Sequence, residues 1–278
     1  MIAFDCNSDP INLFSDRIGA LLFSRGDIVE GKEKVSIALT AADGTRNEPY
    51  PKTVRALMSV CRLGSLPEEK GRTLLTASGS LKDGQFAMND PQLLEKLQAG
   101  DCFGAEGICR FEEKFTRSST GELELDGKAG TFKAVSPRSE TLIRNFPGEL
   151  KGKYMAVKTY YQNSVLCVAA MDGRTLAESR RLVLLHLTNA LNYGSAFADR
   201  EHTVYINRGE LPIVARYGKA DVRLATAGKL FNIYAVALDG KRIGEVPAVM
   251  EGETLTFSAD NFAFPGQVVF AYELLVHE

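Results

Sequence analysis

Apolar residues recur at helical spacing near the start of the chain, in the segment DPINLFSDRIGALLFSR at residues 9–25. The side chains on this stripe are Ile11, Phe14, Ile18, Leu21 and Leu22. Asp9 is a good N-cap, Pro10 suits the first helical position, and Gly26 is typical of a residue that ends a helix. The pattern predicts a helix. We expect its stripe to pack on the rest of the chain or on a second copy, because large exposed apolar patches are unusual.

Most of the remaining pattern is that of strands. Residues 34–44, KVSIALTAADG, alternate as a half-buried strand does, and DPQLLEKLQ at 90–98 predicts a second short helix. After about residue 110, short apolar runs alternate with turn signals and no helical pattern intervenes. The longest run, SRRLVLLHLTNALNYG at 179–194, is rich enough in Leu and Val for a strand buried on both faces.

This pattern predicts a mainly β fold. We expect antiparallel β-sandwich modules with a short N-terminal helix and one further short helix. The predicted domains are an N-terminal segment, 1–110, with the helix and mixed strands, and a β-sandwich region, 111–278.

The polar stretch SSTGELELDGKAGTFKAVSPRSETL, residues 118–142, is rich in serine, threonine and acids. Turn residues at Asp126-Gly127 and Gly130 divide two alternating runs, which is the signature of a β-hairpin. Glu122 and Glu124 alternate with leucines, so we expect them to share the solvent face of one strand. The segment therefore predicts structure rather than catalysis.

Composition and charge narrow the classes of partner. The 278 residues are 45% hydrophobic and 24% charged, with a formal net charge of −2, which is typical of a soluble globular protein. No run of one charge sign points to nucleic acid or to an anionic membrane. No segment approaches the roughly 20 apolar residues that span a bilayer. The first residues, MIAFDCNSDP, lack the pattern of a signal peptide, and the cellular location stays open.

The sequence offers little evidence for a metal site, a bound cofactor or a disulfide bond. The three histidines, His186, His202 and His277, show no metal-binding spacing, and His186 within LVLLHLT suits a core residue better than a catalyst. An odd, scattered set of cysteines predicts free thiols: Cys6, Cys61, Cys102, Cys109 and Cys167. We expect no metal and no cofactor.

Familiar catalytic motifs are also missing from the sequence. The chain has no nucleophile elbow, no P-loop and no dinucleotide-binding glycine motif. The tripeptide Arg-Gly-Asp at 25–27 matches a cell-adhesion motif, but the end of a helix explains it better. Trp is absent, although many sugar sites stack on aromatic rings. Tyr or Phe can substitute, so this only weakens a sugar-binding interpretation.

Four stretches together resemble the C-terminal part of large bacterial glycoside-hydrolase-like proteins, in which β-sandwich modules follow a catalytic (β/α)8 barrel. The stretches are DPINLFSDRIGALLFSRGDI, FTRSSTGELELDGKAGTFKAVSPRSE, MDGRTLAESRRLVLLHLTNALNYGSAF, and YAVALDGKRIGEV with LTFSAD and VFAYELL. The shared motifs are a G-E-L-x-L-D hairpin, then S-P-R-S, and a strand ending N-Y-G where relatives often have N-T-G.

The resemblance implies that residues 9–25 correspond to the last barrel helix and residues 1–6 lie near its last strand. The catalytic acids of such barrels lie on earlier strands, which this chain does not contain, so no catalytic residue is carried over. The upstream barrel of the same polypeptide is then the expected partner, and a polysaccharide the expected ligand. Ser136, Arg138 and Ser139 become ligand-contact candidates at the edge of a substrate cleft.

Asn189 and Asn192 are further ligand-contact candidates, because they lie in a loop that follows the apolar strand LVLLHLT and leads to Glu201. Glu201 is the candidate catalytic acid, although its nearest evident carboxylate is Asp199, two residues away. A glycosidase needs two carboxyl groups that face each other across the sugar bond. The sequence does not exclude such a pair among Glu122, Glu124, Glu140, Glu178 and Glu201.

The sequence therefore predicts a non-catalytic accessory or scaffold region that contacts carbohydrate, and we expect this chain alone to hydrolyse no glycoside. Two alternatives stay open. One is a self-contained hydrolase acting on glycans with an acid pair that is not visible in sequence. The other is a β-sandwich that binds a protein.

Overall fold

The computed structural model describes residues 10–29, 33–41, 62–64, 72–82, 85–88, 111–112, 115–118, 120–198 and 204–277. The chain forms two compact units. The first, here called the sandwich unit, combines Met1–Asp27 with Val135–Glu278, and the second, the inserted unit, is Ile28–Ala134. The mainly β fold is as predicted. The predicted helix at 90–98 lies outside the described residues, and the predicted domain boundary at residue 110 stays a prediction.

Two antiparallel sheets face each other in the sandwich unit. The large sheet has the strand order β20-β19-β23-β13-β12-β9, and the five-stranded sheet the order β10-β11-β18-β22-β21. The strands of the large sheet are β9 (Ser139–Arg144), β12 (Ser164–Ala170), β13 (Arg181–Leu187), β19 (Phe231–Val236), β20 (Arg242–Val246) and β23 (Ala271–Val276). Those of the five-stranded sheet are β10 (Gly148–Lys151), β11 (Met155–Thr159), β18 (Lys219–Ala225), β21 (Ala248–Glu251) and β22 (Thr254–Asp260).

The apolar core lies between these sheets and follows the alternation of each strand. In β18 and β22 every second side chain is buried, among them Val222 and Phe257, because only one face of the five-stranded sheet meets the core. Strand β13 differs. Leu182 and Leu184 belong to the core between the sheets, whereas Leu185 belongs to a second cluster on the opposite face. The predicted strand buried on both faces is confirmed.

Helix α1 (Pro10–Ser24) begins at Pro10, as the capping pattern predicts. At its end, Gly26 adopts a positive φ of 60°, which glycine tolerates without a steric cost. The Gly26 amide donates to the Phe23 carbonyl at 3.0 Å, and the Asp27 amide donates to the Leu22 carbonyl at 3.0 Å. This is the Schellman pattern of helix termination. It directs the chain after α1 so that Asp27 lies beside Arg138, just before β9.

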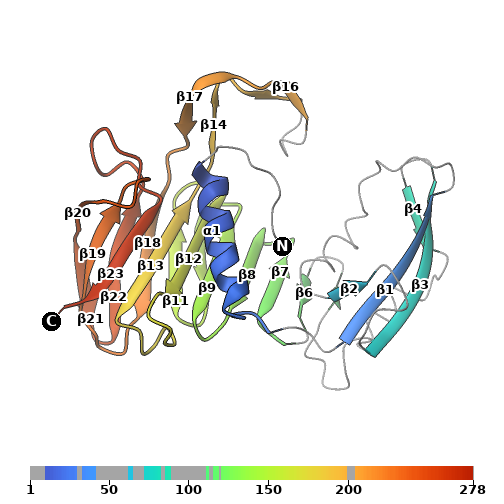
Figure 1. Ribbon diagram of the computed structural model, residues 1–278, viewed down its shortest axis with the longest axis horizontal. Helices are drawn as coiled ribbons and strands as arrows, with labels where there is room; N and C mark the ends of the chain where they lie inside the picture. The colour runs from blue at the N-terminus through green and yellow to red at the C-terminus, as the bar shows by residue number, and fades with distance from the viewer. Residues whose placement is uncertain are drawn as a thin grey trace. The chain divides into compact units, whose positions relative to one another are not determined.

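Helix α1 lies over the outer face of the large sheet (Figure 1). Phe14 and Ile18 pack on a cluster that includes Leu185, Leu187 and Phe270. The rings of Phe14 and Phe270 meet edge to face with centroids 6.3 Å apart, an arrangement that aromatic pairs favour. The helix therefore packs on the sandwich, which is one of the two covers expected for it.

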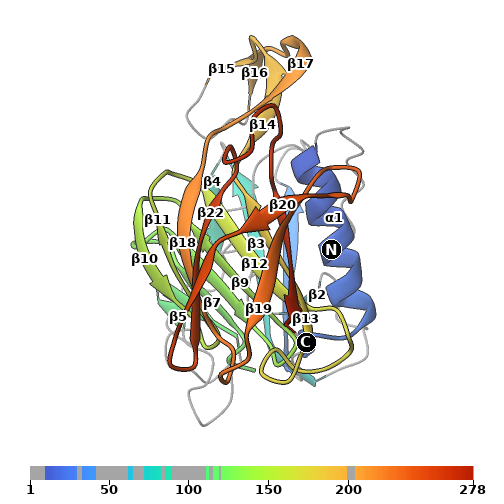
Figure 2. The same cartoon turned by 90° about the vertical axis from the view of Figure 1, so that its left-hand side faces the viewer.

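Between β13 and β18 the chain leaves the sandwich as two small ribbons (Figure 2). The described residues of 190–198 and 204–215 are here called the arm. Its strands pair β14 with β17 and β15 with β16: β14 (Ala190–Tyr193), β15 (Ala196–Phe197), β16 (Tyr205–Asn207) and β17 (Glu210–Ala215). Leu211 and Ile206 are 77% and 71% exposed, so the arm presents apolar side chains to its surroundings.

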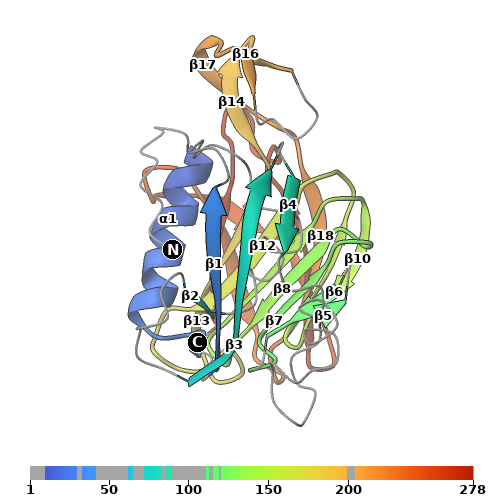
Figure 3. The ribbon, with the colours of Figure 1, turned by 90° about the vertical axis from the view of Figure 1, so that its right-hand side faces the viewer.

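The inserted unit contains two further groups of strands. In one, β1 pairs in parallel with β2 and β3, while β3 pairs antiparallel with β4 (Figure 3). The other is the antiparallel series β5 to β8. The strands are β1 (Glu33–Ala41), β2 (Arg62–Gly64), β3 (Arg72–Lys82), β4 (Gln85–Met88), β5 (Phe111–Glu112), β6 (Phe115–Arg117), β7 (Leu123–Asp126) and β8 (Thr131–Val135).

The hairpin predicted within residues 118–142 is confirmed by the pairing of β7 with β8. Its turn is closed by the Asp126 carboxylate, which accepts from the Ala129 amide at 2.7 Å. Glu124 lies opposite Lys133 and forms an ion pair with it at 3.0 Å. Asp126 and Glu124 are therefore occupied in a turn contact and a cross-strand contact, respectively.

Of the cysteines, Cys167 lies within the described residues, and it is a free, buried thiol, as predicted. Burial raises its pKa to about 11, because the thiolate is poorly solvated in the core. Cys6, Cys61, Cys102 and Cys109 lie outside the described residues.

We expect Phe14→Ala to lower the free energy of unfolding by about 2 kcal/mol, because it removes a half-buried ring from the contact between α1 and the sheet. Chemical denaturation measures the change. Phe23→Ala is the matched control, since Phe23 lies on the same helix but is 76% exposed, and it should change stability by less than about 0.5 kcal/mol. Equal effects of the two substitutions would contradict the assigned packing face.

Candidate functional site

The structure places the candidates Ser136 and Ser139 inside a tight turn before β9. Both side chains are buried. The Ser136 hydroxyl donates to the Ser139 carbonyl at 3.1 Å and accepts from the Ser139 amide at 3.0 Å. The two hydroxyl oxygens lie 2.9 Å apart. The turn itself occupies these groups, and this arrangement fixes the start of β9.

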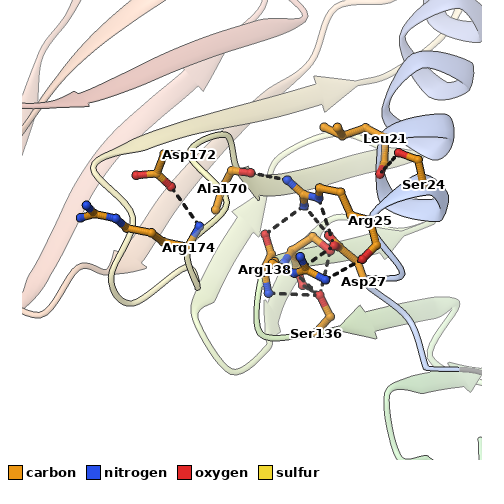
Figure 4. A network of polar contacts seen from close by, with 10 residues as sticks. Leu21, Ser24, Arg25, Asp27, Ser136, Arg138, Ala170, Asp172 and Arg174 are labelled. Atoms are coloured by element: carbon orange, nitrogen blue, oxygen red, sulfur yellow. Dashed lines mark hydrogen bonds and ion pairs between the residues drawn. The ribbon is translucent and has the colours of Figure 1, made fainter.

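Arg138 lies beside these serines and contributes to a buried network around Asp27 (Figure 4). Asp27 is 3% exposed. Its carboxylate forms a two-point ion pair with Arg25, whose Nε lies 3.0 Å from Oδ1, and Arg138 Nε approaches the same oxygen at 3.3 Å. Arg138 also donates to the Arg25 carbonyl at 2.6 Å, and Arg25 donates to the Ala170 carbonyl. The network joins the end of α1 to β9 and β12.

The Arg-Gly-Asp tripeptide is therefore part of this structural network. An adhesion motif must offer its aspartate to a receptor, whereas the Asp27 carboxylate is enclosed by Arg25 and Arg138. A buried carboxylate needs such partners, because an unpaired charge in a protein interior is costly. The helix-end interpretation of the tripeptide is the one that this geometry favours.

Glu140 is a fully buried carboxylate whose role is also architectural. It accepts hydrogen bonds from the backbone amides of Lys153, Tyr154 and Met155 at 3.1, 2.7 and 3.2 Å. Gly152 packs so closely against it that a Cβ at this position would overlap the carboxylate. Glu140 thus holds the turn between β10 and β11, within the interior of the unit.

The other predicted contacts lie at the arm. The Asn189 carbonyl accepts from the Arg216 amide at 2.8 Å, and the Asn192 side-chain amide donates to the Arg208 carbonyl at 3.2 Å. The structure therefore separates Asn189 and Asn192 from the turn at Ser136, which lies at the opposite end of the large sheet. Glu201 and Asp199 lie outside the described residues.

The base of the arm is tied to the sandwich by Asn261, which is fully buried. Its side-chain oxygen accepts from the Gly218 amide at 2.9 Å, and its side-chain nitrogen donates to the Arg216 carbonyl at 2.9 Å and to the Thr188 hydroxyl at 3.4 Å. One amide therefore bridges the strand that enters the arm, the strand that leaves it and the end of β22.

Four exposed aromatic residues gather at this same end of the sandwich unit, and the sequence analysis did not identify them. Here called the aromatic edge, they are Tyr160, Tyr161, Tyr217 and Phe262. Each is between 38% and 45% exposed. Tyr161 and Tyr217 meet edge to face with ring centroids 4.8 Å apart. The ring centroids of Tyr217 and Phe262 are 5.9 Å apart.

Strand register explains why these side chains meet. Tyr160 and Tyr161 follow the end of β11, Tyr217 precedes β18, and Phe262 follows β22. Because Thr159 pairs with Ala220 and Lys219 pairs with Asp260, the three strands end at the same margin of the five-stranded sheet. The aromatic rings therefore lie on connections at one end of that sheet.

Two carboxylates are built into the aromatic edge. The Tyr160 hydroxyl donates to Asp221 at 2.5 Å, and the Tyr217 hydroxyl donates to Asp260 at 3.0 Å. The hydrogen bond to Asp221 raises the pKa of Tyr160, and partial desolvation together with the bond to Asp260 raises that of Tyr217. Both tyrosines therefore remain neutral donors around pH 7.

The arrangement provides three kinds of contact in one exposed place. Ring faces offer apolar surface, carboxylate oxygens accept hydrogen bonds, and the Lys158 ammonium, 5.5 Å from the Tyr160 ring centroid, adds a donor. Such a combination suits a ligand with both apolar C–H faces and hydroxyl groups. Among the described residues, no group of three or more His, Cys, Asp and Glu side chains is placed to hold a metal ion.

Comparison of the chain with protein-family models, with curated proteins and with solved structures finds no match in any of the three. Within the described part of the chain, α1 is too short to cross a bilayer, and no helix there has the length and apolar character to do so.

Removal of the Asp27 carboxylate should destabilise the sandwich unit. We expect Asp27→Ala to lower the free energy of unfolding by about 2–3 kcal/mol, since it leaves two partly buried guanidinium groups without their partner. Asp239→Ala is the matched control, because the Asp239–Lys241 ion pair is exposed and contributes little. Similar losses for the two variants would contradict a structural role for the Asp27 network.

His186 lies in the core, as predicted, and should make stability depend on pH. Burial lowers its pKa to about 4, below the value of about 6.5 in an unfolded chain. The unfolded state therefore binds the proton first, and the folded state loses stability as the pH falls from about 6.5 toward 4. His186→Leu removes this titration, so we expect the stability of the parent relative to the variant to fall by about 2 kcal/mol between pH 7 and pH 5. Denaturation curves that change in parallel over this range would contradict the assignment.

Proposed function

We propose that the chain is a non-catalytic, β-rich accessory region of a glycoside-hydrolase-like protein and that it contacts carbohydrate through the aromatic edge. The observation that carries this proposal is the cluster of Tyr160, Tyr161, Tyr217 and Phe262 with two carboxylates at one end of the sandwich unit. The sequence resemblance to regions that follow a catalytic barrel supports the same assignment.

The chemistry of the aromatic edge suits a sugar better than a purely apolar ligand. A pyranose ring presents C–H groups on its faces, which pack against an exposed aromatic ring, and hydroxyl groups around its rim. The Asp221 carboxylate accepts from the Tyr160 hydroxyl, and the Asp260 carboxylate accepts from the Tyr217 hydroxyl and from the Phe262 amide at 3.0 Å. Each carboxylate retains further acceptor capacity, because its two oxygens carry about four lone-pair sites. The tyrosine bonds also hold both carboxylates in place, which reduces the entropy lost when a ligand binds.

Catalysis is not part of the proposal. Glycoside cleavage needs a protonated acid and a second carboxylate across the sugar bond. Glu140 is enclosed by backbone amides, and Glu178 is exposed and accepts from the Thr175 hydroxyl at 2.9 Å. The proposal therefore assigns hydrolysis to an upstream barrel of the same polypeptide and binding to this chain.

A second candidate function, contact with a protein, is favoured by the arm. Its exposed apolar side chains include Ile206, Leu211 and Val214, and a two-stranded ribbon has little stability of its own. Burial of these side chains against a protein surface would remove apolar area from water. The upstream barrel is the partner that the sequence resemblance implies for the chain as a whole, and the arm is a candidate surface for that contact.

The aromatic edge can be tested by affinity electrophoresis of the purified chain in gels that contain dextran, galactomannan, xyloglucan or xylan. We expect retardation by at least one of these polysaccharides. Tyr161→Ala and Phe262→Ala should each weaken it about tenfold, the loss typical of an aromatic anchor at an interface. Both substitutions leave the two tyrosine–carboxylate hydrogen bonds in place.

Phe23→Ala is the matched control, because Phe23 is an exposed aromatic residue at the opposite end of the sandwich unit. Its retardation should equal that of the parent chain. No retardation of the parent by any polysaccharide, or equal losses for all three variants, would overturn the proposal.

A further inference from the structure

A groove of about 710 Å³ opens on the outer face of the large sheet, away from the aromatic edge. Strand β13 starts beside the groove at Arg181 and ends beside the arm at Leu187, so the two surfaces lie at opposite ends of the sandwich unit. Residues 171–180, which connect β12 to β13, form one wall of the groove. Its volume is within the usual range of ligand-binding clefts.

The groove is rich in arginine, and two of its guanidinium groups are not neutralised. Arg181 and Arg242 share Glu273, with ion-pair distances of 2.8 and 2.9 Å. In contrast, the side chains of Arg174 and Arg180 form no hydrogen bond or ion pair with any residue that the structure describes. Positive charge is therefore available at the groove for an anionic group.

The connection that carries these two arginines is held in a defined conformation. The Asp172 carboxylate accepts from the Arg180 amide at 2.8 Å, from the Ser179 hydroxyl at 2.9 Å and from the Arg174 amide at 3.4 Å. Partial burial opposes ionisation, but these hydrogen bonds outweigh it and keep the pKa of Asp172 below its usual value. Figure 4 shows the Arg174 side chain extending away from the Asp27 network.

The floor of the groove is suited to a ring rather than to a bare ion. Tyr234 and Leu275 line it, and the Arg242 guanidinium lies 4.2 Å from the centroid of the Tyr234 ring. Asn232 adds a side-chain amide whose nitrogen is hydrogen-bonded to His277 Nδ1 at 3.2 Å and which keeps further donor and acceptor capacity. Apolar floor, amide and unpaired guanidinium groups together match a sugar that carries a carboxylate, because guanidinium and carboxylate form paired hydrogen bonds.

We propose that this groove binds the carboxylate of an acidic glycan, with Arg174 and Arg180 as the residues that recognise the charge. The choice of a glycan rests on the proposed function. Nucleic acid is disfavoured as the ligand, since the chain carries a formal net charge of −2 and the unpaired arginines are confined to one groove.

The test compares tetragalacturonate with its fully methyl-esterified form, in which the rings are the same but the charges are absent. Calorimetric titration of the whole chain at low ionic strength should detect the acid and not the ester. We expect Arg174→Gln and Arg180→Gln each to weaken binding of the acid about tenfold. Added salt should weaken binding to the parent chain as well.

Arg208→Gln is the matched control, because Arg208 is an exposed arginine on the arm at the other end of the unit, and it should bind the acid as the parent does. Tyr161→Ala should also bind it normally. Loss of acid binding in Tyr161→Ala but not in the groove variants would overturn this inference and leave the proposed function intact.

Equal binding of acid and ester, or no binding of the acid, would overturn the inference. A single-stranded oligodeoxynucleotide of equal charge that binds more tightly than tetragalacturonate would overturn the glycan assignment. Normal binding of the acid with no retardation on the neutral polysaccharides would instead support the groove and contradict the aromatic edge.

Discussion

Strand β13, in the middle of the large sheet, carries buried apolar side chains on both faces, and the rest of the sandwich unit is arranged to cover it. Leu184 points into the core between the sheets, while its neighbour Leu185 points to the other side. A strand of this kind cannot be satisfied by a second sheet alone, since burial of apolar area is the main favourable contribution to folding. Helix α1 supplies the second cover, and the Asp27 network anchors its C-terminal end where β9 begins and β12 ends.

Because of this arrangement, the groups that are available to bind a ligand lie near the ends of the strands. The interior of the sandwich is occupied by side chains that pack, and its buried polar groups, such as Glu140 and Asn261, hold turns and connections. The exposed rings of the aromatic edge and the unpaired arginines are found on the connections at the two ends of the strands, and Asp221 and Asp260 lie near the strand ends. Antiparallel sandwiches commonly place their variable surfaces there, because loops can change without disturbing the core.

Features that depend on local sequence were predictable. The start of α1 follows from Pro10, its end follows from Gly26, and the double-sided burial of β13 follows from an unbroken apolar run. The aromatic edge was not predictable in this way. Tyr160 and Phe262 are far apart in the chain, and only strand register brings their connections together.

The polar residues that the sequence suggested as ligand contacts illustrate a different difficulty. Ser136 and Ser139 belong to a polar segment that looks suited to ligand contact, yet their hydroxyls close a buried turn. A sequence lists donors and acceptors without showing which of them the backbone uses. Likewise, the free guanidinium of Arg174 cannot be distinguished from the paired one of Arg181 until the position of Glu273 is known.

The attachment of the arm through Asn261 has a consequence for local unfolding of the sandwich unit. Among the described residues, none of the arm belongs to the core between the two sheets. The base of the arm meets the sandwich through Ala215, which packs on the outer cluster, and through hydrogen bonds around the buried Asn261 amide. Segments with few buried contacts unfold locally at a much smaller free-energy cost than the whole domain. We therefore expect amide hydrogens of the arm to exchange with solvent through local opening while the sheets remain folded, and those of β13 to exchange more slowly, through opening of the sandwich itself.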